Sequence, residues 1–157
     1  MNAGRMKSRE RGVAAIEFAL VFVLLFSFLY AIATFGAVFY TQQAVTRAAE
    51  EGARAAGLVT SPTNNDQRVK DAVYAALANS LVVPASSNAS VATRRSWIES
   101  KVVVTALPAG AGATASYVVT VSYPYSENRL LPTMPLLDLS TWVPNQLRSR
   151  STIALRS

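Results

Sequence analysis

A long apolar run near the N-terminus constrains this chain more than any other feature of its sequence. The run extends from Phe18 to Tyr40, and no charged residue occurs between Glu17 and Arg47. Three of its residues are neither apolar nor aromatic: Ser27, Thr34 and Gly36. As an α-helix the run would be about 35 Å long, and the hydrocarbon core of a bilayer is about 30 Å thick. We therefore predict one membrane-spanning helix.

The charges on either side of the run indicate how the helix is oriented. Residues 1–12 contain four basic residues and one acidic residue, so they hold +3 of the chain's formal net charge of +6. On the other side, Arg47 and Arg54 are balanced by Glu50 and Glu51. Because the more basic flank of a membrane helix stays in the cytoplasm, we predict a cytoplasmic N-terminus and an extracytoplasmic remainder.

Two simple interpretations of this segment remain open. The first is an uncleaved signal anchor. The second is a secretory signal that is cleaved after Ala33, since Ala31-Ile32-Ala33 resembles a small-residue cleavage site. A carboxylate at Glu17 and the continuation of the run to Tyr40 fit a secretory signal less well.

Glu17 is a single carboxylate at the start of the apolar run, in the stretch RGVAAIEFALV. A buried, unpaired carboxylate costs several kcal/mol or becomes neutral, so Glu17 needs a partner. One interpretation is a local pair with Arg11 in the headgroup region. The other interpretation depends on a family resemblance.

A basic leader ending at Gly12, four small or apolar residues, Glu17 and a continuous apolar helix resemble the processing site of type IV-like pilins. With AAEEGARAAG at residues 48–57, the sequence resembles the TadE family of minor pilins (pseudopilins) from the tight-adherence (Flp) type IV pilus system. The resemblance covers residues 11–57 well and the rest only loosely.

The resemblance implies a basic leader (residues 1–12), a transmembrane and extended N-terminal helix (13–57) and an extracytoplasmic α+β domain (58–157). A prepilin peptidase would cut between Gly12 and Val13. The new ammonium group of Val13 would then lie four residues before Glu17, which with Phe18 would help to set subunit register. Free N–H groups in the first turn of the helix would also stabilise the carboxylate.

The implied partners are the bacterial inner membrane, the prepilin peptidase, other pilin subunits and the pilus assembly platform. The implied function is a minor pilin that supports assembly of an adhesive pilus. The alternative is a signal-anchored extracytoplasmic binding module that does not polymerise.

Small side chains form one face of the helix beyond Tyr40. They recur at helical spacing and make up the small-residue stripe: Val45, Ala48, Ala49, Gly52, Ala53 and Ala56. Such a face lets another backbone approach closely, either a sheet of the same molecule or a neighbour's helix. Alternatively, alanine only favours the helix. We predict one helix from about Val13 to Ala56, with Gly57 as its C-cap.

The remaining chain predicts a second helix and a small antiparallel sheet. The helix is expected from Asp66 to Asn79, with Val69, Val73, Ala76 and Leu77 on one face. Strands are expected at 97–107, 117–123 and 151–155, a loop up to Ala92, a flexible hairpin tip at 108–115, and irregular chain at 124–147. The predicted fold class is α+β, with the long helix packed on the sheet as in pilins.

Composition argues against an enzyme. The chain has no Cys and no His, and its carboxylates are dispersed. We therefore expect no catalytic residues, no cofactor and no metal site. Outside the leader the basic residues are scattered, so nucleic acid is not an expected partner.

Overall fold

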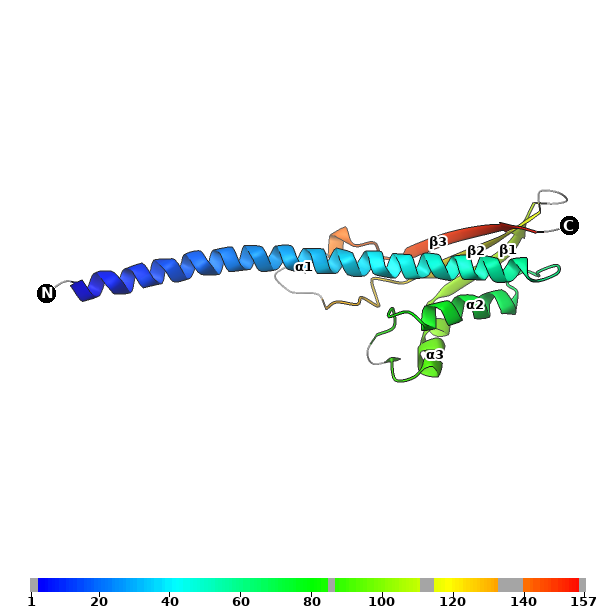
Figure 1. Ribbon diagram of the computed structural model, residues 1–157, viewed down its shortest axis with the longest axis horizontal. Helices are drawn as coiled ribbons and strands as arrows, with labels where there is room; N and C mark the ends of the chain where they lie inside the picture. Colours follow the sequence, from blue (N-terminus) through cyan, green and yellow to red (C-terminus); the bar gives the residue numbers. More distant parts are fainter. Residues whose placement is uncertain (1–2, 85–86, 111–114, 133–139, 156–157) are drawn as a thin grey trace.

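In the part of the chain that the structure, a computed structural model, describes, there are three α-helices, a 3-10 helix and three strands (Figure 1). The structure describes residues 3–84, 87–110, 115–132 and 140–155, with side chains from Gly12 onward except that of Ser140. In chain order the elements are α1 (Ala3–Gly57), α2 (Gln67–Ala78), α3 (Val91–Lys101), β1 (Val103–Ala109), β2 (Ser116–Tyr123), η3 (Ser140–Trp142) and β3 (Leu147–Ala154). The strands form an antiparallel sheet in the order β1-β2-β3. The predicted α+β class is confirmed.

The long helix α1 has two halves with different surroundings. Its C-terminal half lies along the sheet, where it contacts β2, β3 and α2 (Figure 1). Its N-terminal half extends away from the other elements. The helix has 55 residues, which corresponds to about 82 Å. The C-terminal half of α1 is therefore part of the folded outer domain, and its N-terminal half projects from that domain.

The middle strand β2 supplies most of the sheet's contribution to the core. Tyr117, Val119, Val121 and Tyr123 alternate along the strand and all have 0% exposure, so the predicted inward face is confirmed. The Tyr123 hydroxyl donates to the carbonyl of Val82 at 2.7 Å. Because its polar group has a partner, this large side chain can be buried completely, and burial raises the pKa of Tyr123.

The outer edge of β1 is partly closed by one residue of the loop between α1 and α2. Asn65 has a left-handed backbone (φ 54°) and its N–H donates to the carbonyl of Ala106 at 2.6 Å. Its side-chain oxygen accepts from the N–H of Ala106 at 3.1 Å. These two hydrogen bonds satisfy groups that an edge strand would otherwise expose.

Helix α2 agrees with the sequence within one residue at each end. Asp66 is the N-cap, and its carboxylate accepts from the N–H of Arg68 at 3.0 Å. The Arg68 side chain also donates to this carboxylate and lowers the pKa of Asp66. The inward-facing residues Val69, Val73 and Leu77 are buried against α1 and the sheet.

The predicted start of the long helix was wrong, whereas its predicted end at Ala56 lies within one residue of the observed end. The helix begins at Ala3, so most of the basic leader is helical too. Gly57 is the last helical residue and has no positive φ, so it is not a left-handed C-cap. Its lack of a side chain has another reason, because a Cβ there would lie 2.6 Å from Cδ1 of Ile153. Close approach of the sheet explains this glycine.

The predicted strand at 97–107 was wrong in its first half, where the structure has the end of α3. Ser90, expected in a loop, caps this helix by accepting from the N–H of Thr93 at 3.1 Å. Only Ile98 of α3 is fully buried, so no apolar periodicity marked the helix. The strand itself, β1, begins at Val103.

Two other boundaries also differ. Strand β3 begins at Leu147, four residues before the predicted start. Pro108 and Ala109, expected in the hairpin tip, belong to β1. Residues 111–114 of that predicted tip, and residues 133–139 of the predicted irregular segment, lie outside the described residues. In the described part of that segment, only η3 and Leu147, the first residue of β3, are regular.

Candidate processing and assembly site

The stretch of α1 from Val13 to Leu29, here called the free half of α1, exposes a continuous apolar surface. Its large apolar side chains from Val13 to Leu29 are between 41% and 71% exposed. The first hydrogen bond to the outer domain is at Tyr30, and the first core residue is Val38. Helix α1 is the one helix among the described residues that is long and apolar enough to cross a membrane. The exposed leucine and phenylalanine side chains between Val13 and Leu29 fit a lipid environment better than water.

The hydroxyl groups within the apolar run are satisfied by the helix itself. Ser27 donates to the carbonyl of Val23 at 2.7 Å, and Thr34 donates to that of Tyr30 at 2.8 Å. These are i to i−4 bonds of the kind that hide a hydroxyl from its surroundings. In hydrocarbon an unpaired hydroxyl is costly, so these bonds make both residues compatible with a bilayer.

Gly12, Val13 and Glu17 lie at the exposed start of this free half. All three are exposed and helical. Val13 and Glu17 are four residues apart, so they share one face of the helix. Around Gly12 nothing lies within 4 Å of the position a Cβ would take. No part of the described fold therefore covers the predicted cleavage position or requires a glycine there.

A row of phenylalanine rings follows Glu17 on the helix surface. Phe18 stacks on Phe22, and Phe22 stacks on Phe26, each pair with ring centroids 6.1 Å apart. Of these three residues, only Phe18 was predicted from the sequence to be an assembly residue. The i, i+4 spacing of the three phenylalanines was the signal that could have indicated the whole row.

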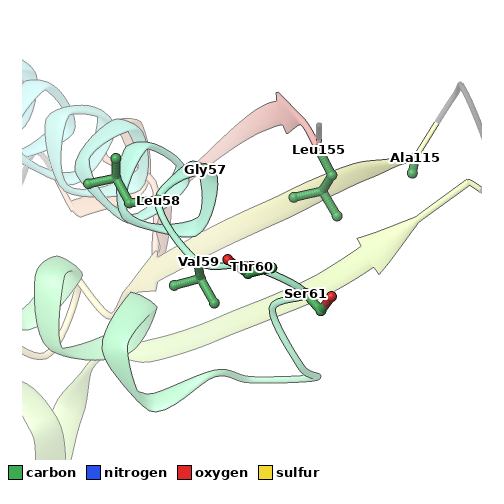
Figure 2. Close-up of a pocket in the computed structure, with 7 residues that line it drawn as sticks. All are labelled: Gly57, Leu58, Val59, Thr60, Ser61, Ala115 and Leu155. Atoms are coloured by element: carbon green, nitrogen blue, oxygen red, sulfur yellow. The ribbon is translucent and has the colours of Figure 1, made fainter. Parts of the chain in front are cut away.

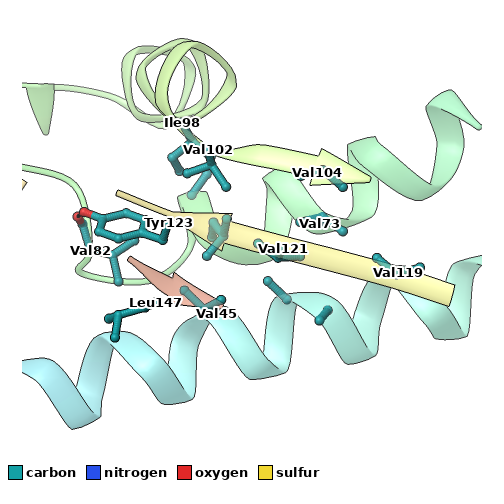
Figure 3. Close-up of a cluster of buried hydrophobic side chains, with 14 of the residues drawn as sticks. Val45, Val73, Val82, Ile98, Val102, Val104, Val119, Val121, Tyr123 and Leu147 are labelled. Atoms are coloured by element: carbon teal, nitrogen blue, oxygen red, sulfur yellow. Dashed lines mark hydrogen bonds between the residues drawn. The ribbon is translucent and has the colours of Figure 1, made fainter. Parts of the chain in front are cut away.

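The small-residue stripe lies at the other end of α1, inside the outer domain. All six of its residues are buried. Val45, Val73, Val119 and Val121 pack together between α1, α2 and β2 (Figure 3). The sheet and α2 of the same chain therefore occupy the stripe. Val13 and Val45 are about 48 Å apart along the helix, so the processing residues and the stripe are separate sites.

Gly52 is the tightest point of the stripe. A Cβ there would lie 2.6 Å from Cγ2 of Val73 and 3.0 Å from Cγ1 of Val119. Overpacking of this kind costs about 1–3 kcal/mol, whereas alanine improves helix propensity by about 1 kcal/mol. We expect Gly52→Ala to lower the free energy of unfolding by up to about 2 kcal/mol, which near-ultraviolet circular dichroism during thermal unfolding would measure.

Gly36→Ala is the matched control, because nothing lies within 4 Å of a Cβ at Gly36 on the same helix. It should leave the melting temperature of the outer domain unchanged or slightly higher. Equal melting temperatures for Gly52→Ala and the unmodified chain would contradict the close packing described here.

A shallow pocket of about 320 Å³ lies at the distal end of the outer domain (Figure 2). Gly57, Leu58 and Ser61 line one side, and Ala115 and Leu155 line the other. The pocket has no charged side chain, so it offers no acid, base or metal ligand. Among the described residues no cluster of three or more potential metal ligands was found.

A protruding apolar helix joined to two further helices and a three-stranded antiparallel sheet defines an α+β class of protein whose long helix is compatible with a membrane. Within this class, the family model described as TadE-like protein matches residues 12–54. The resemblance inferred from the sequence is thus confirmed over that part of the chain, and it suggests a minor pilin associated with the tight-adherence (Tad) pilus. Comparisons with curated proteins and with solved structures found no match.

The matched segment contains Gly12, Val13, Glu17 and Phe18 at its start and most of the small-residue stripe at its end. The TadE-like family is a structural family rather than a family of enzymes. The absence of catalysis in this chain stays a prediction, as do the roles of the individual site residues.

Proposed function

We propose that this chain is a minor pilin, or pseudopilin, that supports assembly of a tight-adherence pilus. It is made with residues 1–12 as a cytoplasmic leader, and a prepilin peptidase cuts between Gly12 and Val13. Its helix then holds it in the bacterial inner membrane with residues 58–157 outside. Other pilin subunits and the pilus assembly platform are its partners.

One observation supports this proposal more than any other. From Val13 to Leu29, α1 is free of the outer domain, apolar and exposed, and the only carboxylate of this stretch, Glu17, lies near its start. The family match begins at Gly12, next to the proposed new N-terminus. A simple anchor needs the apolar surface but has no need of a carboxylate at this position.

Cleavage would give Glu17 a partner that the uncut chain lacks. Hydrolysis of the Gly12–Val13 peptide bond leaves a carboxylate on Gly12 and an amino group on Val13, which is protonated at neutral pH. This ammonium lies one helical turn from Glu17 and can pair with it or with Glu17 of a neighbouring subunit. The pair would offset the cost of placing the carboxylate in an apolar environment.

Intermolecular packing is assigned to the free half of α1. The small-residue stripe is filled by the chain's own sheet and α2, so it has no room for a neighbour's helix. The phenylalanine row and the other apolar side chains between Val13 and Leu29 have no partner within the described fold. Filament contacts would bury this surface when the subunit leaves the lipid.

Copurification with sheared filaments tests this function. A minor pilin should be found with pili sheared from intact cells, in amounts well above those of an unrelated single-pass membrane protein in the same preparation. Its presence only in the membrane fraction, with none on the filament or the assembly platform, would favour the alternative of a signal-anchored binding module that does not polymerise.

A further inference from the structure

The connection between β2 and β3 reaches back along α1, away from the sheet. Its described residues are 124–132 and 140–146, here called the β2–β3 loop. In Figure 1, η3 and residues 124–132 lie on opposite sides of α1, nearer the N-terminus than the strands. The hydroxyl of Tyr30 donates to the carbonyl of Pro132 at 2.6 Å. This bond fixes the axial position of the loop on the helix.

That position lies within the thickness of a bilayer if Glu17 marks its inner boundary, a condition that rests on the proposed membrane anchoring. Tyr30 is about 20 Å from Glu17 along the helix, and a hydrocarbon core of about 30 Å would end near Ala37. The next residue, Val38, is the first core residue of the outer domain. The β2–β3 loop therefore contacts α1 about 10 Å below the outer boundary.

The part of the loop next to Tyr30 has a chemistry that suits this depth. Leu130-Leu131-Pro132 has no charged residue, and Pro132 has no N–H that needs an acceptor. Its carbonyl is satisfied by Tyr30. Irregular backbone in hydrocarbon is tolerated only where its polar groups are satisfied by protein, and Pro132 meets that requirement.

Trp142 gives the loop an unpartnered aromatic side chain. It belongs to η3 and is 76% exposed. Tryptophan is enriched where a bilayer meets water, because its ring is apolar and its N–H can reach polar headgroups. The chain's other tryptophan, Trp97, is half-buried, with its ring 6.3 Å from that of Tyr123.

We propose that the β2–β3 loop is a second membrane contact, with Trp142 inserted among the lipids of the outer leaflet. The outer domain would then rest on the bilayer in a fixed orientation. When the subunit moves from the membrane into a filament, this contact must be broken together with the lipid contacts of α1.

The two tryptophans provide the test. Full-length Trp97→Phe, which keeps Trp142, and Trp142→Phe, which keeps Trp97, are reconstituted in phosphatidylcholine–phosphatidylglycerol vesicles containing lipids brominated at defined depths of the acyl chain. Bromine near the headgroup end should remove much of the Trp142 emission and leave the Trp97 emission unchanged. Equal, negligible quenching of both tryptophans would overturn the proposal.

Flotation of the same vesicles separates this failure from failure of the membrane anchor. Protein that floats with the vesicles but shows no quenching of Trp142 overturns only the loop contact. Protein that does not float overturns both the anchor and the loop contact.

A second measurement tests the proposal independently in case the Trp97→Phe variant does not fold. The chain has no cysteine, so Trp142→Cys and Thr93→Cys can each carry one spin label. The label at position 142 should be more accessible to oxygen than to a nickel chelate, and the label at position 93, on exposed α3, should show the reverse. Preferential access of the chelate at both positions would contradict lipid contact by the loop.

Discussion

The Gly12→Leu variant should remain uncleaved and accumulate with its basic leader attached. A peptidase site that accepts glycine before the scissile bond has little room for a branched side chain there. A clash costing about 3 kcal/mol in the transition state would slow cleavage about 100-fold. Mass spectrometry of the membrane-extracted protein over time would measure the fraction of chains that begin at Val13.

The structure makes this experiment specific, because a side chain at Gly12 meets nothing within 4 Å in the described fold. The melting temperature of the outer domain should therefore not change. Any loss of cleavage must then come from how the peptidase accepts residue 12 and not from misfolding of the substrate. Gly36→Leu is the matched control, since Gly36 is equally open on the same helix, and it should be cleaved normally. Normal cleavage of Gly12→Leu would contradict the assigned processing site.

Glu17→Ala should insert into the membrane normally but be largely absent from filaments. Insertion does not need the carboxylate, because removing a charge lowers the cost of entering the bilayer. In a filament, the Val13 ammonium would be left without its partner in an apolar contact, and breaking a buried pair costs about 3–5 kcal/mol. Incorporation should therefore fall by about 100-fold or more, measured by immunoblotting sheared pili against the membrane fraction.

Glu50→Ala provides the control for loss of a carboxylate alone. Glu50 is also exposed on α1, but it lies beyond the free half of the helix, and its replacement should leave incorporation unchanged. If Glu17→Ala and Glu50→Ala were incorporated equally well, the proposed role of Glu17 in assembly would be wrong.

The features that could be predicted from the sequence are those with a strong local pattern. Phe18–Tyr40 is apolar almost throughout its length. In β2, the fully buried residues Tyr117, Val119, Val121 and Tyr123 occur at every second position. Asp66 belongs to a residue type that is strongly preferred at helix N-caps. In each case, neighbouring residues along the chain carried enough information.

The features that were missed depend on contacts between distant residues. Helix α3 buries only Ile98 fully, so its apolar pattern was too weak to distinguish it from a strand. Gly57 looked like a helix C-cap, and only the approach of Ile153 from β3 explains it. The contact of Pro132 with Tyr30 joins residues 102 positions apart, and no local pattern indicates such a bond.

The same limit applies to the candidate site. The sequence indicated the small-residue stripe but left two partners possible, a sheet of the same chain or a neighbour's helix. The structure shows Val73 and Val119 of the same chain against Gly52. That result moves the proposed intermolecular contacts to the free half of α1, where the phenylalanine row lies.

The N-terminal residue of the protein extracted from native membranes tests the central claim most directly. Intact mass measurement with N-terminal sequencing should give a chain that begins at Val13 and still contains the apolar helix. A start at Met1 or Asn2 would indicate an uncleaved anchor. A start at Thr34, with the whole apolar stretch from Val13 to Leu29 gone, would contradict the account altogether.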